Sequence, residues 1–459
     1  MSGPSVPVPE GSGVYSAEEV SSLEQQGIFA RPSVPRSLKR TVKLAGLFPS
    51  PTLSSASSSS SSARSSASAS MSFRSYTFTN GEVDLPTTQE SSEALEFIGF
   101  NTPTANHIFS RWLARGDGNP DGLIDYVLAH VRGRNQNGET RTNPRAAMNA
   151  MGLLQEFSEV HLDPGNAEVR DTETMIFWIQ DTLTMRYKTI DLCNRRLKRA
   201  AARGKRSKKV KRESITSYVW TSEPSVPEVS ATIDGPEEAV NAILPRLPAS
   251  HIAVGSAGPV LPYHIVLYKG KSAAEVGEDF IMPGGSVNMA AIATAPGGDF
   301  NCDRRAWYWT EEEAVAEKYR GWAAERNGLA ESWIIRVQIP TSFMSRLRRE
   351  ELNYSTDWKE YIWLCRKQLM LPSKFNKFAE EADVMCGHIC SRDNGRVTSL
   401  KKEEVHSQIT ERWVMRLNNN RNTRIVFMKA NVANEVASHV CGNMHITVIA
   451  ALERQTSQH

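Results

Sequence analysis

Residues 305–326 read RAWYWTEEEAVAEKYRGWAAER, and this stretch decides the fold class of the C-terminal half of the chain. The alternation of large residues predicts a β-strand, with Trp307 and Trp309 on one face and Tyr308 on the other. Thr310 and the Glu three residues later have the spacing of a capping box, so the rest of the stretch predicts a helix. A strand that leads directly into a helix indicates a domain of mixed α and β structure.

Further strand and helix signals surround this stretch. Short apolar runs bounded by Gly, Pro or polar residues predict more strands, and amphipathic runs predict more helices. The strands are expected at 264–268, 332–339, 382–389 and 424–428, a helix at 431–440, and a short helix or strand at 357–366. Strands mixed with short helices in irregular order indicate an α+β fold for a C-terminal domain over 259–459.

The ordered motifs of this domain resemble the ADP-ribosyltransferase-like fold, and are closest to its toxin-like branch of uncharacterised microbial domains. The motifs are Leu267-Tyr-Lys-Gly270, Gly297-Gly-Asp-Phe300, Ala306-Trp-Tyr-Trp-Thr310, Asp357-Trp-Lys-Glu-Tyr-Ile362 up to Arg366, Ala382-Asp-Val-Met-Cys-Gly387 and Arg424-Ile-Val-Phe427. The resemblance covers about residues 260 to 440 and depends on the order and spacing of the motifs. It implies two small packed sheets with short helices, and a cleft between them that binds NAD as a substrate.

The resemblance also implies roles for residues of the first motifs. Lys269 occupies the position of a His or Arg that holds the ribose, with Gly270 beside it. Tyr308 occupies the position of an aromatic residue that stacks on nicotinamide, and Thr310 is the hydroxyl residue that follows. In such folds a Glu from a later strand stabilises the oxocarbenium-like state, because cleavage of the glycosidic bond builds positive charge on the ribose.

Arg424 stands where the resemblance implies that acidic residue, and a guanidinium beside a developing cation has the wrong sign. Glu360 and Asp357 are the nearby carboxylates that could replace it, and Glu360 is the candidate catalytic residue. The alternative for Glu360 is a solvated helix residue, since exposed Glu is the usual case. Lys269 also departs from Arg, because an ammonium lacks the planar fork that binds bidentately.

No metal site is expected. Cys386, His388 and Cys390 lie close together in the sequence, but no second pair at zinc-finger spacing accompanies them. Alternate residues on one strand rarely close a tetrahedron, and a strand with buried thiols is the favoured interpretation.

The N-terminal half of the chain divides by composition. Residues 1–90 are rich in Ser and Pro, and fourteen of the twenty-two residues 54–75 are Ser, which predicts a disordered tail. Over residues 91–192 apolar residues recur at spacings of three and four, which predicts an all-helical interaction module with an unidentified protein partner. Trp112 and Trp178 are expected to pack in the core of this module.

A basic segment over 193–213 follows the module, and eleven of the eighteen residues 195–212 are Lys or Arg. Two basic clusters around small residues fit a signal that a nuclear-import carrier reads, and Gly204 is expected to end the preceding helix. Nonspecific contact with nucleic acid is the rival, since phosphate attraction needs only charge. A solvated helix end is the plain alternative. A Pro-rich linker is predicted over 214–258.

Charge, cysteine content and hydropathy indicate where the protein acts. The chain has 54 Lys and Arg against 51 Asp and Glu, a net charge of +3, so without the basic segment it would be acidic. Six irregularly spaced cysteines indicate a reducing compartment, which favours the nucleus or the cytoplasm. No apolar run approaches the roughly 18–20 residues of a membrane span, so no membrane contact is expected.

Three functions remain open from the sequence. The first is NAD-dependent ADP-ribosyl transfer or NAD glycohydrolysis by the C-terminal domain, which requires a carboxylate near Lys269 in the folded cleft. The second is a catalytically inactive module that binds an anion or ADP-ribose through Lys269 and Arg424. The third is a scaffold that acts through the helical module and the basic segment, with a cleft filled by its own side chains.

Overall fold

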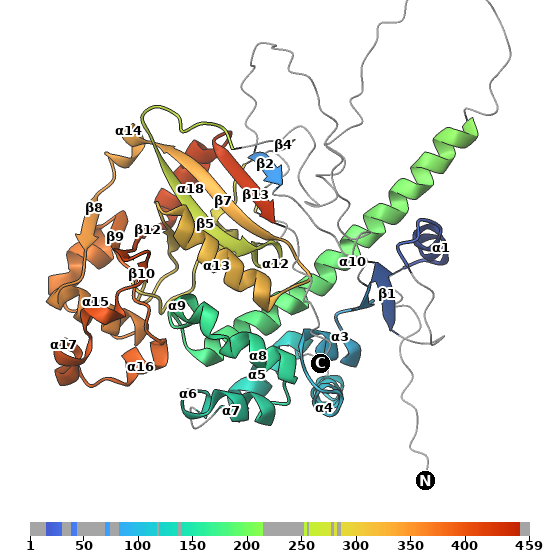
Figure 1. Ribbon diagram of the computed structural model, residues 1–459, viewed down its shortest axis with the longest axis horizontal. Helices are drawn as coiled ribbons and strands as arrows, with labels where there is room; N and C mark the ends of the chain where they lie inside the picture. Colours follow the sequence, from blue (N-terminus) through green and yellow to red (C-terminus); the bar gives the residue numbers. More distant parts are fainter. Residues whose placement is uncertain are drawn as a thin grey trace, which may run out of the picture.

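The structure of the chain is a computed structural model (Figure 1). It describes residues 15–29, 38–43, 69–73, 82–116, 119–135, 139–213, 252–254, 257–276, 280–281 and 286–449. The linker predicted at 214–258 therefore lies outside the described residues, except for 252–254 and 257–258. The described part is a mixed α and β structure, as the sequence predicts for its C-terminal half.

Helices make up most of the described part of the N-terminal half. They are α1 (Ala17–Gln25), α3 (Ser92–Ile98), α4 (Thr102–Leu113), α5 (Leu123–Arg134), α6 (Glu139–Thr142), α7 (Pro144–Ala150), α8 (Gln155–Leu162), α9 (Ala167–Arg170) and α10 (Met175–Glu213). Three strands accompany them: β1 (Lys39–Lys43), β2 (Ala69–Phe73) and β3 (Glu82–Pro86).

The C-terminal half alternates strands with shorter helices. The strands are β4 (Ile252–Val254), β5 (His264–Ser272), β6 (Trp307–Trp309), β7 (Ser332–Pro340), β8 (Arg349–Leu352), β9 (Val384–His388), β10 (Arg416–Leu417), β11 (Asn420–Arg421), β12 (Thr423–Phe427) and β13 (Met444–Ile449). The α-helices are α12 (Ala273–Val276), α13 (Glu313–Arg326), α14 (Thr341–Met344), α15 (Thr356–Arg366), α16 (Asn394–Ser399), α17 (Val405–Gln408) and α18 (Ala430–Val440).

The larger sheet has five strands in the order β4-β2-β13-β7-β5. Side chains of β7 alternate between its two faces. On one face Ile335 and Val337 join a core cluster with Val432 and Val436 of α18. On the other face Gly270 of β5, the partner of Ile334 in the register, lies directly under α13. The sheet is thus covered by a helix on each side.

The smaller sheet has four strands in the order β6-β12-β9-β8. Its core cluster includes Tyr308 of β6, whereas Trp307 and Trp309 belong to the cluster of the larger sheet. The alternation that the sequence predicts for this strand is therefore confirmed. The strand lies between the two cores because it presents one aromatic face to each. The predicted capping box at the start of α13 is absent, since Thr310 Oγ1 accepts from Glu312 N at 3.1 Å and the N-cap residue of α13 is Glu312.

The helical module packs directly on the C-terminal domain. Met185 and Leu192 of α10 belong to the core cluster of the larger sheet. Trp178 of α10 shares another cluster with Val315 and Trp322 of α13. In Figure 1 α10 runs from the module past the sheets and extends well beyond them. The C-terminal domain is thus one partner of the module, within the same chain, and an external partner stays a prediction.

The basic segment continues α10 without a break. The helix runs through Gly204 to Glu213, so the expected helix end at this glycine is wrong. A glycine inside a helix costs only about 1 kcal/mol, and the neighbouring Lys, Arg and Ala residues favour helix. Arg196 of the first basic cluster is buried, and its guanidinium forms an ion pair with Glu331 at 2.7 Å. This arginine therefore joins α10 to the C-terminal domain rather than being available to a partner.

Part of the N-terminal segment predicted as disordered is ordered in the structure. Strands β1 and β3 pair in antiparallel register, and α1 packs against α10. Leu23, Val42 and Leu85 share a buried cluster with Leu197 of α10. Strand β2, from the Ser-rich tract, pairs in parallel with β13. Short apolar stretches within a polar tail thus fold against a helix and a strand far away in the sequence.

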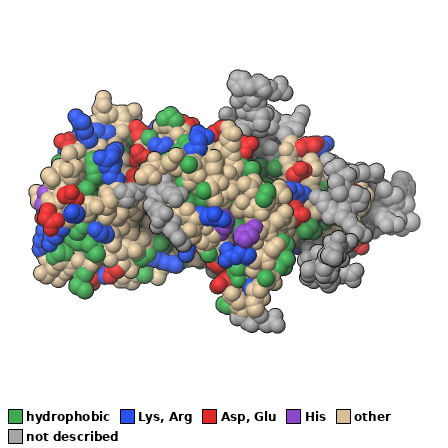
Figure 2. Space-filling view, turned by 90° about the horizontal axis from the view of Figure 1, so that it is seen from below, with side chains coloured by type: hydrophobic (Ala, Val, Ile, Leu, Met, Phe, Trp, Pro, Cys, Tyr) green, Lys and Arg blue, Asp and Glu red, His purple; other side chains and the backbone are tan. Residues whose placement is uncertain are grey.

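The described surface carries both signs of charge. Figure 2 shows Lys and Arg side chains interspersed with Asp and Glu over one face of the molecule. Among the described residues, no helix is long and apolar enough to cross a membrane. Nothing on this face indicates a single dominant charged surface.

His161 lies at the contact between α8 and α13. Its Nδ1 is 2.8 Å from the carbonyl oxygen of Phe157, and its Nε2 is 3.0 Å from Thr182 Oγ1, which also accepts from Arg326 Nη1. Burial lowers the pKa of His161 to about 3, and the nearby Arg326 contributes in the same direction. The imidazole is therefore neutral in the folded protein at neutral pH.

Mild acid is expected to destabilise this contact. An unfolded His has a pKa of about 6.5 and takes up a proton that the folded imidazole excludes. Stability is therefore lost as the pH falls below about 6.5, by up to about 1.4 kcal/mol per pH unit. His161→Asn should lose less stability than wild type between about pH 7.5 and 5.5 in thermal melts. His406→Asn, at an exposed site on α17, should behave as wild type. Equal pH slopes for His161→Asn and wild type would contradict this assignment.

Candidate functional site

The two sheets meet at a short contact between β5 and the end of β6. Tyr268 N donates to Thr310 O at 2.7 Å, and Thr310 N donates to Tyr268 O at 3.1 Å. Tyr268 belongs to the five-stranded sheet, and Thr310 directly follows β6 of the four-stranded sheet. The residues next to this bridge on either strand therefore converge, although about forty positions separate them in the chain.

A cavity of about 160 Å³ lies at this contact. Its walls come from β5, β6, α13 and the segment around the start of α10. The four residues predicted to bind the cofactor all line it: Lys269, Gly270, Tyr308 and Thr310. An engineered cavity of about 150 Å³ holds benzene, so this space accommodates about one aromatic ring.

Lys269 is buried next to the bridge between Tyr268 and Thr310. Its Nζ donates to the carbonyl oxygen of Tyr308 at 2.8 Å and lies 5.8 Å from the ring centroid of Trp309. Burial lowers the pKa of Lys269 well below its ordinary value, and the positive charge of Lys271 adds to this. The amine is thus a fixed donor whose protonated form is disfavoured.

Tyr308 is held rigidly between the cores. Its hydroxyl donates to Asn301 Oδ1 at 2.7 Å and accepts from Phe300 N at 3.0 Å. Burial raises the pKa of Tyr308, so the phenol stays neutral. The guanidinium carbon of Arg424 lies 5.2 Å from the ring centroid, in cation–π contact. A ring that stacks on Tyr308 would therefore lie close to the guanidinium of Arg424.

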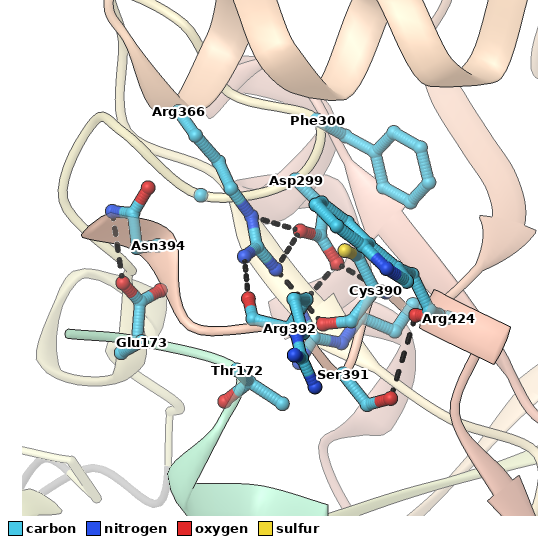
Figure 3. A network of polar contacts seen from close by, with 12 residues as sticks. Thr172, Glu173, Asp299, Phe300, Arg366, Cys390, Ser391, Arg392, Asn394 and Arg424 are labelled. Atoms are coloured by element: carbon cyan, nitrogen blue, oxygen red, sulfur yellow. Dashed lines mark hydrogen bonds and ion pairs between the residues drawn. The ribbon is translucent and has the colours of Figure 1, made fainter. Parts of the chain in front are cut away.

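Asp299 organises the polar network behind the cavity (Figure 3). Its side chain is fully buried, and Oδ1 accepts from Arg366 Nε at 2.8 Å and from Nη2 at 2.5 Å. Oδ2 accepts from Cys390 N at 3.1 Å and from Arg424 Nη1 at 3.2 Å. The sequence motif Gly297-Gly-Asp-Phe300 marks this place, but a role for its carboxylate was not expected.

Arg424 lines the cavity, at the position where the resemblance implies an acid. Besides Asp299 it contacts the hydroxyl of Tyr319, a neighbour in α13. The positive charge of Arg424 is thus partly compensated by a buried carboxylate that it shares with Arg366. Arg424 acts here as a paired cation that connects β12 to α13.

Glu360 does not belong to this cavity. It lies on α15, its Oε2 accepts from Lys374 Nζ at 2.6 Å, and it is absent from the residues that line the cavity. Asp357, the other carboxylate considered, is also near Lys374, at 3.4 Å. The helix buries its aromatic residues in the core of the smaller sheet, and this orientation turns both acids toward Lys374. The structure does not bring Glu360 together with Lys269.

Other carboxylates do line the cavity, and two of them come from the segment that precedes or begins α10. Asp181 forms an ion pair with Arg326, and Glu275 forms one with Lys271 at 3.3 Å. Glu173 Oε2 accepts from Asn394 Nδ2 at 3.3 Å. Burial raises the pKa of Glu173 to about 7, opposed by the positive charge of Arg366. No local pattern in the sequence connects these acids to the strands of the cleft.

Three buried hydrogen-bond donors on residues that line the cavity lack a partner within the described ranges: Trp309 Nε1, Trp322 Nε1 and Arg326 Nε. An unsatisfied buried donor costs about 1–3 kcal/mol, and these donor atoms have almost no accessible surface. Trp309 comes from β6 and Trp322 from α13.

A second cavity of about 220 Å³ adjoins the first. The two share Asp181, Lys271 and Glu275 as lining residues. The second cavity extends along α10 toward Lys188 and Val276. Together they reach the range of about 300–1,000 Å³ that small-molecule sites usually occupy.

Within the described ranges, no group of three or more His, Cys, Asp or Glu residues could hold a metal ion. Of the residues considered as zinc ligands, His388 accepts from Tyr354 N at 2.9 Å through Nδ1, and both cysteines are buried.

Comparison with known proteins finds no matching family model, no matching curated protein and no matching solved structure.

Proposed function

We propose that the C-terminal domain binds NAD in this cavity and cleaves the bond between nicotinamide and ribose, by ADP-ribosyl transfer or NAD glycohydrolysis. The observation that carries the proposal is that Lys269, Gly270, Tyr308 and Thr310, distant in sequence, line one cavity. The space fits about one ring beside Tyr308, and the adjoining cavity adds about 220 Å³ for a further part of the ligand.

The charges around the cavity suit a reaction that develops positive charge. Glu173, Asp181 and Glu275 are lining carboxylates, and a carboxylate stabilises an oxocarbenium-like transition state more than the ground state. Asp181 and Glu275 are already paired with Arg326 and Lys271, so among the described residues Glu173 is the lining carboxylate that has no cationic partner. Arg424 would oppose this, and Asp299 offsets its charge only in part because the same carboxylate also pairs with Arg366. The requirement of a carboxylate in the same cleft as Lys269 is therefore met, by residues other than Glu360.

A catalytically inactive module that binds an anion or ADP-ribose is the second candidate. Arg424 in the wall of the cavity favours it. The ion pairs of three lining cations weigh against it, because a paired cation attracts an anion less: Arg424 with Asp299, Lys271 with Glu275, and Arg326 with Asp181. A scaffold whose cleft is filled is disfavoured by the open cavity itself.

Action in the nucleus or the cytoplasm is part of the proposal, with a nuclear-import carrier that binds residues 195–212. Because Arg196 pairs with Glu331 inside the fold, the cluster nearer to Arg212 is the part that a carrier would read. Nonspecific nucleic-acid contact by the same residues is the rival. Import that persists after substitution of the basic residues from 203 to 212 would favour that rival or a plain helix end.

Lys269→Met in the full chain is expected to weaken NAD binding by about 2- to 12-fold, because a hydrogen bond between neutral groups contributes about 0.5–1.5 kcal/mol. Calorimetric titration measures the affinity, and nicotinamide release measures turnover. Lys402→Met, at an exposed site far along the chain, is the control and should bind as wild type. Binding without release in wild type would favour the inactive module, and no binding would refute the proposal.

A further inference from the structure

Glu173 reaches the cavity from outside the C-terminal domain. It lies in the short segment between α9 and α10, which belongs to the helical module. The side chain is partly buried and lines the cavity together with Lys269 and Tyr308. Figure 3 shows it facing Asn394, beside the network of Asp299 and Arg366. The helical module thus contributes a carboxylate to the wall of the cavity.

The environment of Glu173 differs from that of the other acids at the site. Asp181, Glu275 and Asp299 each form an ion pair with a neighbouring cation. The described residues include no ion pair of Glu173, whose hydrogen-bond partner is the neutral amide of Asn394 on α16. A carboxylate held by an amide is oriented without a cation that would neutralise it.

The charged groups around Glu173 come from α15, from β12 and from the loop that precedes β6. Arg366 of α15 and Arg424 of β12 lower its pKa, whereas Asp299 raises it. Burial is the largest effect, and the net result is a pKa of about 7. A general base is most efficient when its pKa lies near the working pH, because it is then both available and basic enough.

We propose that Glu173 is the catalytic base of this site, an inference that rests on the proposed function. An attacking hydroxyl, from water or from an acceptor, forms a bond to the anomeric carbon of the ribose. The bond from that carbon to the nicotinamide nitrogen breaks, and its electron pair stays on nicotinamide, which leaves as a neutral molecule. The proton of the attacking hydroxyl passes to the Glu173 carboxylate. Asn394 is then the positioning residue that aims this carboxylate.

The test uses the full chain, NAD and water as the acceptor, with calorimetry for binding and nicotinamide release for turnover. Glu173→Gln should bind NAD within about threefold of wild type but lose about 100-fold or more in kcat, since general bases contribute about 10²–10⁴-fold. Wild-type turnover should fall below about pH 7, and Glu173→Gln should lack this acid limb. Glu168→Gln, in the neighbouring helix α9 and partly exposed, is the matched control and should keep the wild-type rate and profile.

The outcomes separate this inference from the proposed function. Wild type that neither binds nor cleaves NAD overturns the proposed function, and the role of Glu173 with it. Wild type that cleaves NAD while Glu173→Gln retains both rate and pH profile overturns only the role of Glu173. If Glu173→Gln melts at a much lower temperature, Glu173→Asp decides, because it keeps the acid and should retain the acid limb at a reduced rate.

Discussion

Asp299→Asn is expected to lower the free energy of unfolding by about 3–5 kcal/mol, the usual cost of leaving a buried charge without its partner. The Asp299 carboxylate is the acidic partner of both Arg366 and Arg424. The amide that replaces it keeps the shape but not the charge, and its NH₂ group would face a guanidinium. Arg366 is itself buried and would retain only the carbonyl oxygens of Arg392 and Cys390.

Chemical denaturation of the purified chain measures this loss. Asp303→Asn is the matched control, because Asp303 lies four residues away, pairs with Arg304 at 3.2 Å and has a side chain that is 70% exposed. Exposed ion pairs contribute about 0–1 kcal/mol, so the control should stay close to wild type. Equal losses in the two variants would mean that the Asp299 network does not carry the stability assigned to it.

Local pattern was sufficient for most elements of the C-terminal half. Each predicted strand there corresponds to an observed one, and alternation correctly divided Trp307, Tyr308 and Trp309 between two cores. These elements are predictable because their apolar residues recur with the period of a strand or of a helix. The bridge between Tyr268 and Thr310 then brings the predicted residues together, which the order of the motifs implies but no local pattern specifies.

Strand β13 was not predicted, although its sequence carries a signal. Met444, Ile446 and Val448 alternate with His445 and Thr447, the pattern of a strand with one apolar face. The first three belong to the core of the larger sheet, where this strand pairs with β7. Its other neighbour, β2, comes from the Ser-rich tract, and a composition so poor in apolar residues gives no local sign of pairing.

The acids of the site were missed for a different reason. Glu173 and Asp299 are 126 positions apart, and the charge of each matters only because α10 and the two sheets pack together. Glu360 was offered as a substitute carboxylate that would act only if the fold turned it into the cleft. Eight of the eleven residues of α15 are buried, so this helix has little freedom to turn a given residue there. Sequence pattern finds the strands of this site, and tertiary packing supplies its carboxylates.

Gly270→Ala is expected to separate α13 from β5 and to lower the free energy of unfolding by about 3 kcal/mol or more, the upper range for overpacking. A Cβ at this position would lie 1.9 Å from the carbonyl oxygen of Ala316 and 2.6 Å from the backbone nitrogen of Arg320. Both are main-chain atoms of α13, so no side chain can rotate away and the whole helix must shift.

The shift would also open the cavity, because Gly270 and Ala316 both line it, so NAD affinity should fall together with the melting temperature. Gly321→Ala on the same helix is the control, and it should raise the free energy of unfolding rather than lower it. Its Cβ would meet nothing within 4 Å, and alanine stabilises a helix interior over glycine by about 0.5–1 kcal/mol. A Gly270→Ala protein as stable as wild type would show that α13 and β5 do not pack at this distance. The wall of the proposed NAD site that Gly270 and Ala316 form would then also be wrong.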